Sequence, residues 1–288
     1  MAKNYPRIGL ALGSGGAKGL AHIGVFRSLE KHGIAISYIA GSSVGSIMGA
    51  LYAHYYDSKK LEALVLALTR KKGMRLFDLT VRGGLLKGNK MELFIREILE
   101  DAQFKDLKVP LSVVATDFNT AEPVVFTSGD LIRAIRASIA VPAIYQPIFY
   151  KDRLLADGGL SNPVPVSIAS KMGADITIAV NLDHVYVENP FRELPALMRI
   201  PMHAINILRH NLALREISNA DVIITPENKA HIGLMGWGSV FDHKKATKII
   251  EAGEIATDKK IPELLKKIEE YNKNHSYINR FVSVFKKR

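Results

Sequence analysis

A serine stands in the small-residue run Gly41-Ser42-Ser43-Val44-Gly45, between the apolar runs Ile34–Ala40 and Ile47–Ala53. This Gly-x-Ser-x-Gly pattern predicts a strand, a sharp turn and a helix, with the Ser43 hydroxyl at the apex. Small neighbours are needed there because the backbone of such a serine is strained. The N-terminus of the following helix favours an alkoxide or an oxyanion beside Ser43. The alternative is an ordinary tight turn, which the pentapeptide alone does not exclude.

A second cluster, Gly13-Ser14-Gly15-Gly16-Ala17-Lys18-Gly19, follows the strand-like run Ile8–Leu12 and opens a helix-like run. Consecutive glycines let backbone N–H groups converge on a negatively charged oxygen, because no Cβ atom blocks the approach. A dinucleotide fingerprint is disfavoured, because Lys18 occupies its sixth position and no acidic residue follows the second strand. A P-loop is disfavoured because Gly19, rather than Ser or Thr, follows the lysine. An oxyanion-stabilising loop beside Ser43 fits both clusters.

A third element, Asp157-Gly158-Gly159, follows the apolar residues Leu154-Leu155-Ala156. An acid at the end of such a strand, with two glycines behind it, can reach a nucleophile across the edge of a sheet. The alternative is a plain Asp-Gly turn, and the tripeptide in isolation favours that alternative.

In this order and spacing, the three elements resemble those of the patatin-like phospholipase family of acyl hydrolases. The resemblance runs from about Ile8 to about Asn181 and includes Ala115-Thr116-Asp117-Phe118 and the stretch Arg136–Pro142. It implies that Ser43 is the nucleophile and Asp157 the base of a Ser–Asp dyad.

The same resemblance places Ser14, Gly15 and Gly16 in the oxyanion hole. The motif-supporting residues are Gly13, Lys18, Gly19, Gly41, Gly45, Gly158 and Gly159. The glycine frame of the family falls on positions 14, 16 and 19, and the first of these is Ser14 here. Because serine is poor at positive φ, either this position is not left-handed in this chain or the loop is reshaped.

Strand-like and helix-like stretches alternate along the chain, which favours an α/β fold. The runs Ile8–Leu12, Leu111–Ala115 and Asp175–Val180 are typical of strands buried on both faces of a sheet. We therefore expect three layers, α/β/α, around a central, mostly parallel sheet of the patatin-like kind. Residues 6–225 are expected to form the catalytic domain, and residues 226–288 a C-terminal helical extension packed on it.

The chain has a net charge of +11 and no cysteine, which excludes disulfides and thiol catalysis. The positive excess favours an anionic partner, and a membrane surface is preferred over nucleic acid because no zinc spacing or RNA-binding signature occurs. Many basic proteins bind neither. The first residues do not form a secretory signal, so we expect a cytoplasmic protein with peripheral contact to an anionic membrane. No cofactor or metal is expected, since neither His-Glu-x-x-His nor an Asp-rich calcium loop is present.

The apolar and basic residues of Pro195–Ile217 fit either a lipid-docking helix or, more commonly, a helix that faces the core. Histidines after Asp157 lie in no loop signature of a Ser–Asp–His triad; they are His184, His203, His210, His231, His243 and His275. The expected substrates are phospholipids, lysophospholipids or simpler acyl esters, as the resemblance implies. The alternative function is a non-catalytic lipid- or acyl-binding regulator on the same scaffold.

Overall fold

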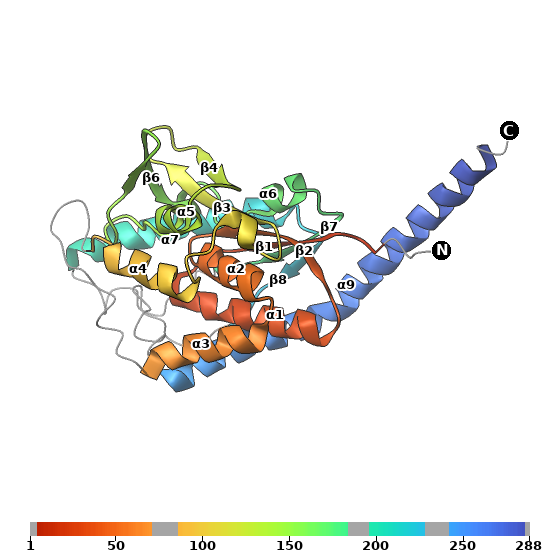
Figure 1. Ribbon diagram of the computed structural model, residues 1–288, viewed down its shortest axis with the longest axis horizontal. Coiled ribbons are helices and arrows are strands. Elements are labelled where there is room, and N and C mark those ends of the chain that lie inside the picture. Colours follow the sequence, from red (N-terminus) through yellow and green to blue (C-terminus); the bar gives the residue numbers. More distant parts are fainter. Residues whose placement is uncertain (1–4, 71–85, 184–195, 228–241, 286–288) are drawn as a thin grey trace.

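The computed structural model of the protein describes residues 5–70, 86–183, 196–227 and 242–285 (Figure 1). Its strands form one eight-stranded sheet, with hydrogen-bonded neighbours in the order β5-β6-β3-β2-β1-β7-β8 and with β4 paired to β3. The strands are β1 (Ile8–Leu12), β2 (Ile36–Ser42), β3 (Leu111–Asp117), β4 (Pro123–Phe126), β5 (Ile148–Tyr150), β6 (Arg153–Asp157), β7 (Ile176–Val180) and β8 (Val222–Ile224).

The helices of the described residues lie between these strands and after them. The α-helices are α1 (Ala21–Lys31), α2 (Val44–Tyr55), α3 (Ser58–Arg70), α4 (Asn89–Ile98), α5 (Leu131–Ser138), α6 (Val166–Lys171), α7 (Ala196–Ile217) and α9 (His243–Phe285). Short 3-10 turns are η1 (Gly16–Leu20), η3 (Phe104–Asp106) and η4 (Gly158–Leu160).

The centre of the sheet is parallel, as β3, β2, β1, β7 and β8 all run in one direction. Every residue of β1, β3 and β7 is buried, which is why these strands read as continuous apolar runs rather than alternating ones. Strands β4 and β6 run antiparallel to β3.

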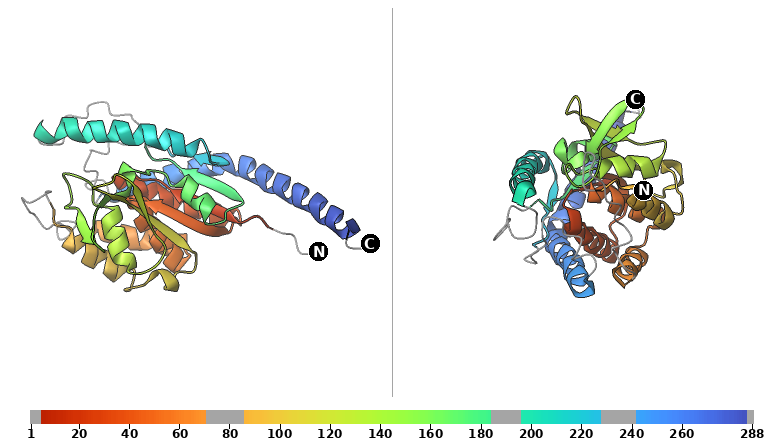
Figure 2. Two further views of the ribbon diagram at one scale, coloured as in Figure 1. Left: turned by 90° about the horizontal axis from the view of Figure 1, so that it is seen from above. Right: turned by 90° about the vertical axis from the view of Figure 1, so that its left-hand side faces the viewer.

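Helices cover both faces of the sheet (Figures 1 and 2). Residues of α1, α2, α3, α4, α5 and α9 share one large core cluster with the side chains of one sheet face. Residues of α6 and α7 share a second cluster with Ala11, Ala40, Val114 and Ala179 of the strands. The expected three-layer α/β/α fold with a mostly parallel central sheet is therefore confirmed.

Strand β3 brings two distant parts of the sequence together. Val114 pairs with Ser42 of β2, and the next residue, Ala115, pairs with Asp157 of β6. Strand β4 also pairs with Val114 and Ala115 of β3. Because a strand has only two edges, β4 takes one edge of β3, and β2 and β6 follow each other along the other. The last residues of β2 and β6 consequently meet end to end.

Helix α9 lies along α1 and continues beyond the body of the molecule (Figure 1; Figure 2, left). The two helices pack closely because both carry glycine at the contact. A Cβ atom on Gly24 would lie 1.9 Å from the carbonyl oxygen of Ile250, and one on Gly253 would lie 2.0 Å from that of Ala21. The division at residue 226 stays a prediction, since α9 shares the core cluster of the preceding helices.

Candidate active site

Ser43 and Asp157 meet where β2 and β6 end. The Ser43 hydroxyl donates a hydrogen bond to Asp157 Oδ2 at 2.6 Å, and the two residues are 7% and 3% exposed. Ser43 caps the N-terminus of α2 with φ 53° and ψ −125°, a backbone conformation that costs a non-glycine residue strain energy. The strand, turn and helix predicted around Ser43 are thus all present, and the apex residue directly contacts the acid.

Serine hydroxyls hold the strained turn in place. The Ser43 N–H donates to Ser138 Oγ at 2.9 Å, and the Ser138 hydroxyl donates to the Val114 carbonyl at 2.6 Å. The Ser46 hydroxyl donates to the Ser43 carbonyl at 2.6 Å. Sequence reasoning missed Ser138, although it lies in the Arg136–Pro142 stretch that carries part of the family resemblance.

The Asp157 carboxylate is oriented by the turn that follows it. The Gly159 N–H donates to Asp157 Oδ1 at 2.8 Å, which leaves Oδ2 for Ser43. Burial raises the pKa of Asp157 to about 6, against the opposing effects of the Ser43 and Gly159 hydrogen bonds and of the Arg209 charge. A carboxyl group with this pKa is a better base than an ordinary aspartate, and it is still ionised at neutral pH.

The glycine loop lies between β1 and η1. Gly15 and Gly16 have φ 154° and 57°, whereas Ser14 is not among the non-glycine residues with positive φ. Position 14 is therefore not left-handed in this chain, which is the first of the two alternatives considered for a serine there. Its N–H donates to the Pro163 carbonyl at 2.8 Å. Among the hydrogen bonds of the described residues, none is donated by the N–H groups of Gly15 or Gly16, so both remain available for a substrate oxygen.

Two glycines allow the close approaches that assemble the site. A Cβ atom on Gly19 would lie 2.2 Å from Val44 Cγ2, so glycine lets η1 pack against the first turn of α2. A Cβ atom on Gly158 would lie 2.1 Å from the Val114 carbonyl oxygen, so glycine lets the Asp157 turn lie against β3. Three other motif-supporting glycines, Gly13, Gly41 and Gly45, also lie against backbone oxygens, and Gly159 lies against the side chains of Asp157, Arg209 and Ser14.

Polar side chains lie beside the glycine loop. The Lys18 ammonium donates to the Leu182 carbonyl at 3.2 Å, and burial lowers the pKa of this lysine. Asp183, which follows β7, accepts hydrogen bonds from Ser14 Oγ and from Arg209 of α7. Sequence reasoning missed Asp183 and Arg209, because neither belongs to a motif and they are separated by 26 positions.

Histidines of the described residues do not share the hydrogen bonds of Ser43 or Asp157. His22 is buried, and its Nε2 lies 2.9 Å from the Gly13 carbonyl oxygen; burial lowers its pKa to about 4. His210 Nδ1 lies 2.5 Å from the Asp183 carbonyl oxygen. Two of the histidines considered for a triad, His184 and His231, lie outside the described residues.

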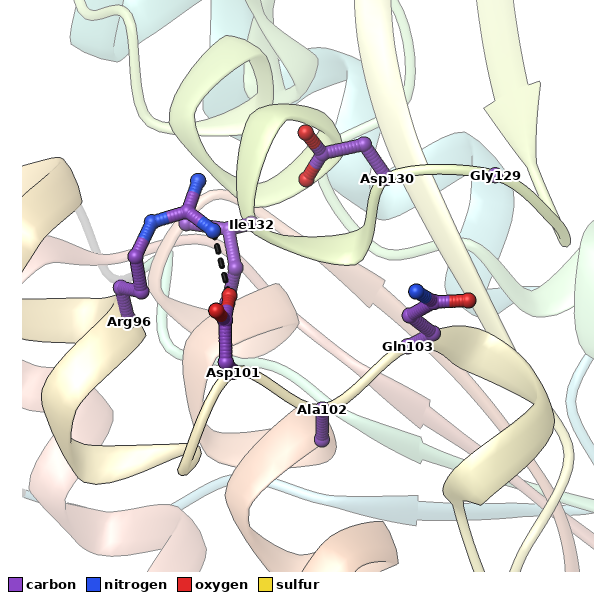
Figure 3. A pocket seen from close by; sticks show the side chains of 7 residues that line it. All are labelled: Arg96, Asp101, Ala102, Gln103, Gly129, Asp130 and Ile132. Atoms are coloured by element: carbon purple, nitrogen blue, oxygen red, sulfur yellow. Dashed lines mark hydrogen bonds and ion pairs between the residues drawn. The ribbon is translucent and has the colours of Figure 1, made fainter.

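A surface hollow of about 350 Å³ lies elsewhere, between α4 and the start of α5 (Figure 3). Arg96 and Asp101 form an ion pair at its edge, and Asp130 caps α5 through the Arg133 N–H. Neither Ser43 nor Asp157 lines this hollow, so it is separate from the serine–aspartate pair. In the described ranges, no cluster of three or more histidine, aspartate or glutamate side chains is arranged to hold a metal ion.

A family model described as patatin-like phospholipase matches residues 10–170. The chain belongs to the patatin-like phospholipase family. The chain is 40% identical over 182 residues to an uncharacterized NTE family protein of Mycobacterium tuberculosis, covering 62% of this chain and 49% of the relative. It is 35% identical over 181 residues to patatin-like phospholipase domain-containing protein 7 of Mus musculus, covering 61% of this chain and 13% of that protein.

The patatin-like chain thus spans about half the length of the mycobacterial relative and a small part of the mouse protein. Two solved structures also align with it. VipD from Legionella pneumophila has a TM-score of 0.44 at 12% identity, covering 92% of this chain and 67% of VipD. The type III effector ExoU has a TM-score of 0.44 at 15% identity, covering 91% of this chain and 53% of ExoU. Neither value bears on function.

The two loop glycines of this patatin-like site should differ in their tolerance of alanine. At Gly15 a Cβ atom would lie 2.9 Å from Leu182 Cβ, whereas at Gly16 it would meet nothing within 4 Å. Gly15→Ala should therefore displace the loop and lower kcat by roughly 10²–10³, the effect of losing one oxyanion donor. Gly16→Ala bears only the strain of its positive φ and should lose less.

Ester turnover of the two purified variants measures this difference. If the loop N–H groups bind the oxyanion, KM should change less than kcat, because such donors act on the transition state. Full activity of a folded Gly15→Ala variant would reassign the loop to a purely structural turn.

Proposed function

We propose that this protein is a serine hydrolase of lipid acyl esters, with Ser43 as nucleophile and Asp157 as base. The observation that carries the proposal is the 2.6 Å hydrogen bond between Ser43 Oγ and a buried carboxylate whose pKa is raised to about 6. The membership of the patatin-like phospholipase family supports a lipid ester as the substrate.

In the first half of the reaction, Asp157 accepts the Ser43 proton as Oγ attacks the ester carbonyl carbon. The carbonyl oxygen becomes an oxyanion, which the N–H groups of Gly15 and Gly16 stabilise together with the N-terminus of α2. Collapse of this tetrahedral species breaks the bond to the alcohol. The proton held by Asp157 passes to the leaving oxygen, and an acyl-serine remains.

In the second half, Asp157 accepts a proton from a water molecule, which attacks the acyl-serine carbonyl. The bond to Ser43 Oγ breaks, the proton held by Asp157 passes to Ser43 Oγ, and the fatty acid leaves. The Gly159 N–H keeps the carboxylate in one orientation through both halves, because it binds Oδ1 while Oδ2 exchanges the proton.

A lipid-binding regulator on the same fold is the second candidate, since a fold does not determine a function. A protein that only binds acyl chains has no use for a strained serine in contact with a carboxylate of raised pKa. Hydrolysis of p-nitrophenyl acyl esters separates the two candidates. The hydrolase releases p-nitrophenolate over many turnovers, whereas stoichiometric binding of the ester without release would favour the regulator.

We further propose that the outer face of α7 contacts an anionic membrane surface. The apolar residues of α7 do not all face the core. Met202 and Ala213 are buried, whereas Ile200 and Leu208 are 71% and 65% exposed. Helix α7 contains three arginines and one acid, Glu216, and Arg209 is paired with Asp183. The other two arginines, Arg199 and Arg215, leave a small positive excess that favours anionic lipid. In the described part of the chain no helix is long and apolar enough to cross a bilayer.

Vesicle flotation tests the membrane contact, using the Ser43→Ala background so that no lipid is consumed. Vesicles of phosphatidylcholine with phosphatidylglycerol should carry the protein upward, and Ile200→Ser/Leu208→Ser should lower the bound fraction several-fold. Leu93→Ser is the matched control, because Leu93 of α4 is also 65% exposed and should not alter flotation. Equal flotation of the α7 variant and its parent would contradict this contact.

A further inference from the structure

Asp183 is a buried acid that the proposed reaction does not use. Its side chain is 2% exposed, and it accepts hydrogen bonds from Arg209 Nε at 2.7 Å and from Ser14 Oγ at 3.0 Å. Arg209 Nη2 also lies 2.6 Å from the same Asp183 oxygen that Nε reaches. A carboxylate at this depth is retained in a fold only when it is paired and hydrogen-bonded, and here both conditions are met.

These contacts join three separate segments around the serine–aspartate pair. Ser14 belongs to the glycine loop, Asp183 follows β7, and Arg209 comes from the middle of α7. A Cβ atom on Gly159 would lie 2.9 Å from Asp157 Oδ1, 3.0 Å from Arg209 Cδ and 3.2 Å from Ser14 Cβ. The arginine side chain and the glycine loop therefore both lie against the Gly159 turn that orients Asp157.

We propose that Arg209 and Asp183 are positioning residues for the catalytic pair Ser43 and Asp157. The ion pair between Arg209 and Asp183 fixes the glycine loop through Ser14 and holds a positive charge beside the Asp157 turn. The inference rests on the proposed role of Asp157 as the base. It gives Ser14 a role other than that of an oxyanion donor: its N–H is already bonded to Pro163, and its hydroxyl ties the loop to Asp183.

The two partners of this ion pair act on Asp157 in opposite directions. The positive charge of Arg209 lowers the pKa of Asp157, and the negative charge of Asp183 raises it. Ser43 and Gly159 contribute hydrogen bonds but no charge. The other charged or titratable residues on elements around the turn are Lys18 of η1, Asp117 of β3, Arg153 of β6, Arg133 and Arg136 of α5, and Arg199, His203, His210, Arg215 and Glu216 of α7.

The test is the pKa of Asp157, measured from the carbon-13 chemical shift of its labelled carboxyl carbon, which does not depend on turnover. Arg209→Gln should raise this pKa because the stabilising cation is lost. Asp183→Asn should lower it because the repelling anion is lost. Shifts of about half a unit to one unit in opposite directions are expected for charges at this range. The double variant Arg209→Gln/Asp183→Asn should return the pKa close to that of the wild type.

Two further variants separate positioning from simple stabilisation. Arg209→Gln alone leaves a buried charge unpaired and can unfold the protein, whereas the double variant has no such charge. Arg209→Lys keeps the cation and should retain the wild-type pKa. Asp175→Asn removes the ion pair with Arg7 at the opposite end of β7, and it should leave the pKa of Asp157 unchanged.

The pH dependence of kcat/KM then reports the consequence for the reaction. Because Asp157 must be ionised to accept a proton, the pH at which kcat/KM falls on the acid side should move with the pKa of Asp157 measured by carbon-13 NMR. Ser14→Ala should lower kcat more than it raises KM, since the loop donors act on the transition state. Equal pKa values of Asp157 in wild type and Asp183→Asn would overturn the inference. If the variants shift the pKa of Asp157 as expected but the wild type shows no ester turnover, the proposed function alone would be overturned.

Discussion

Replacing Ser43 with alanine should lower ester turnover by up to ~10⁶-fold, as removal of the nucleophile does in serine hydrolases generally. The reason is local: Ser43 occupies the apex of the turn, and its hydroxyl is the group that contacts Asp157. A fluorophosphonate probe should label the wild type and leave Ser43→Ala unlabelled.

The labelling experiment has a matched control in Ser112→Ala. Ser112 is also buried, but it lies in β3 and donates to the Met172 sulfur, so its loss should leave labelling intact. Persistent labelling of the Ser43→Ala variant at Ser42 or Ser46 would move the nucleophile to a neighbouring residue.

Asp157→Asn should lower kcat by about 10³–10⁴, near the upper limit for loss of a general base. Asparagine keeps the size of the side chain and an oxygen that can accept the Gly159 N–H, so the turn should fold normally. It cannot accept the Ser43 proton, and the serine stays a weak nucleophile. Steady-state kinetics with circular dichroism as the folding control would measure both properties.

The same experiment distinguishes a dyad from a triad when it is extended to the histidines. The structure gives Asp157 hydrogen bonds from Ser43 and Gly159 and none from a described histidine. Each single alanine variant of the histidines after Asp157 should therefore retain substantial activity. A folded histidine variant as inactive as Ser43→Ala would establish a Ser–His–Asp triad. The positions to change are His184, His203, His210, His231, His243 and His275.

Local patterns predicted the elements that carry the site. The glycines around Ser43 predicted the turn. The structure shows why glycine is needed there, because a Cβ atom at Gly45 would lie 2.2 Å from the Leu12 carbonyl oxygen. The continuous apolar runs predicted buried parallel strands because both faces of the sheet are covered by helices.

Long-range contacts were beyond the reach of the same reasoning. Ser43 and Asp157 are 114 positions apart, and they meet because β2 and β6 share one edge of β3, a pairing that no local pattern encodes. The Ser14–Asp183–Arg209 contacts depend likewise on the path of α7 across the sheet. For α7 the sequence left two alternatives open, a core-facing helix and a lipid-docking helix. The helix has both buried and exposed apolar residues, and periodicity alone does not tell which of them pack.

Lipid products provide the most direct test of the central claim that Ser43 and Asp157 hydrolyse acyl esters. Mass spectrometry after incubation of purified protein with mixed phospholipid and lysophospholipid vesicles would measure the fatty acids released. The wild type should release free fatty acid together with the matching deacylated lipid, while Ser43→Ala and Asp157→Asn release neither. Equal release by the wild type and Ser43→Ala, or an unchanged lipid composition with the wild type, would contradict the account.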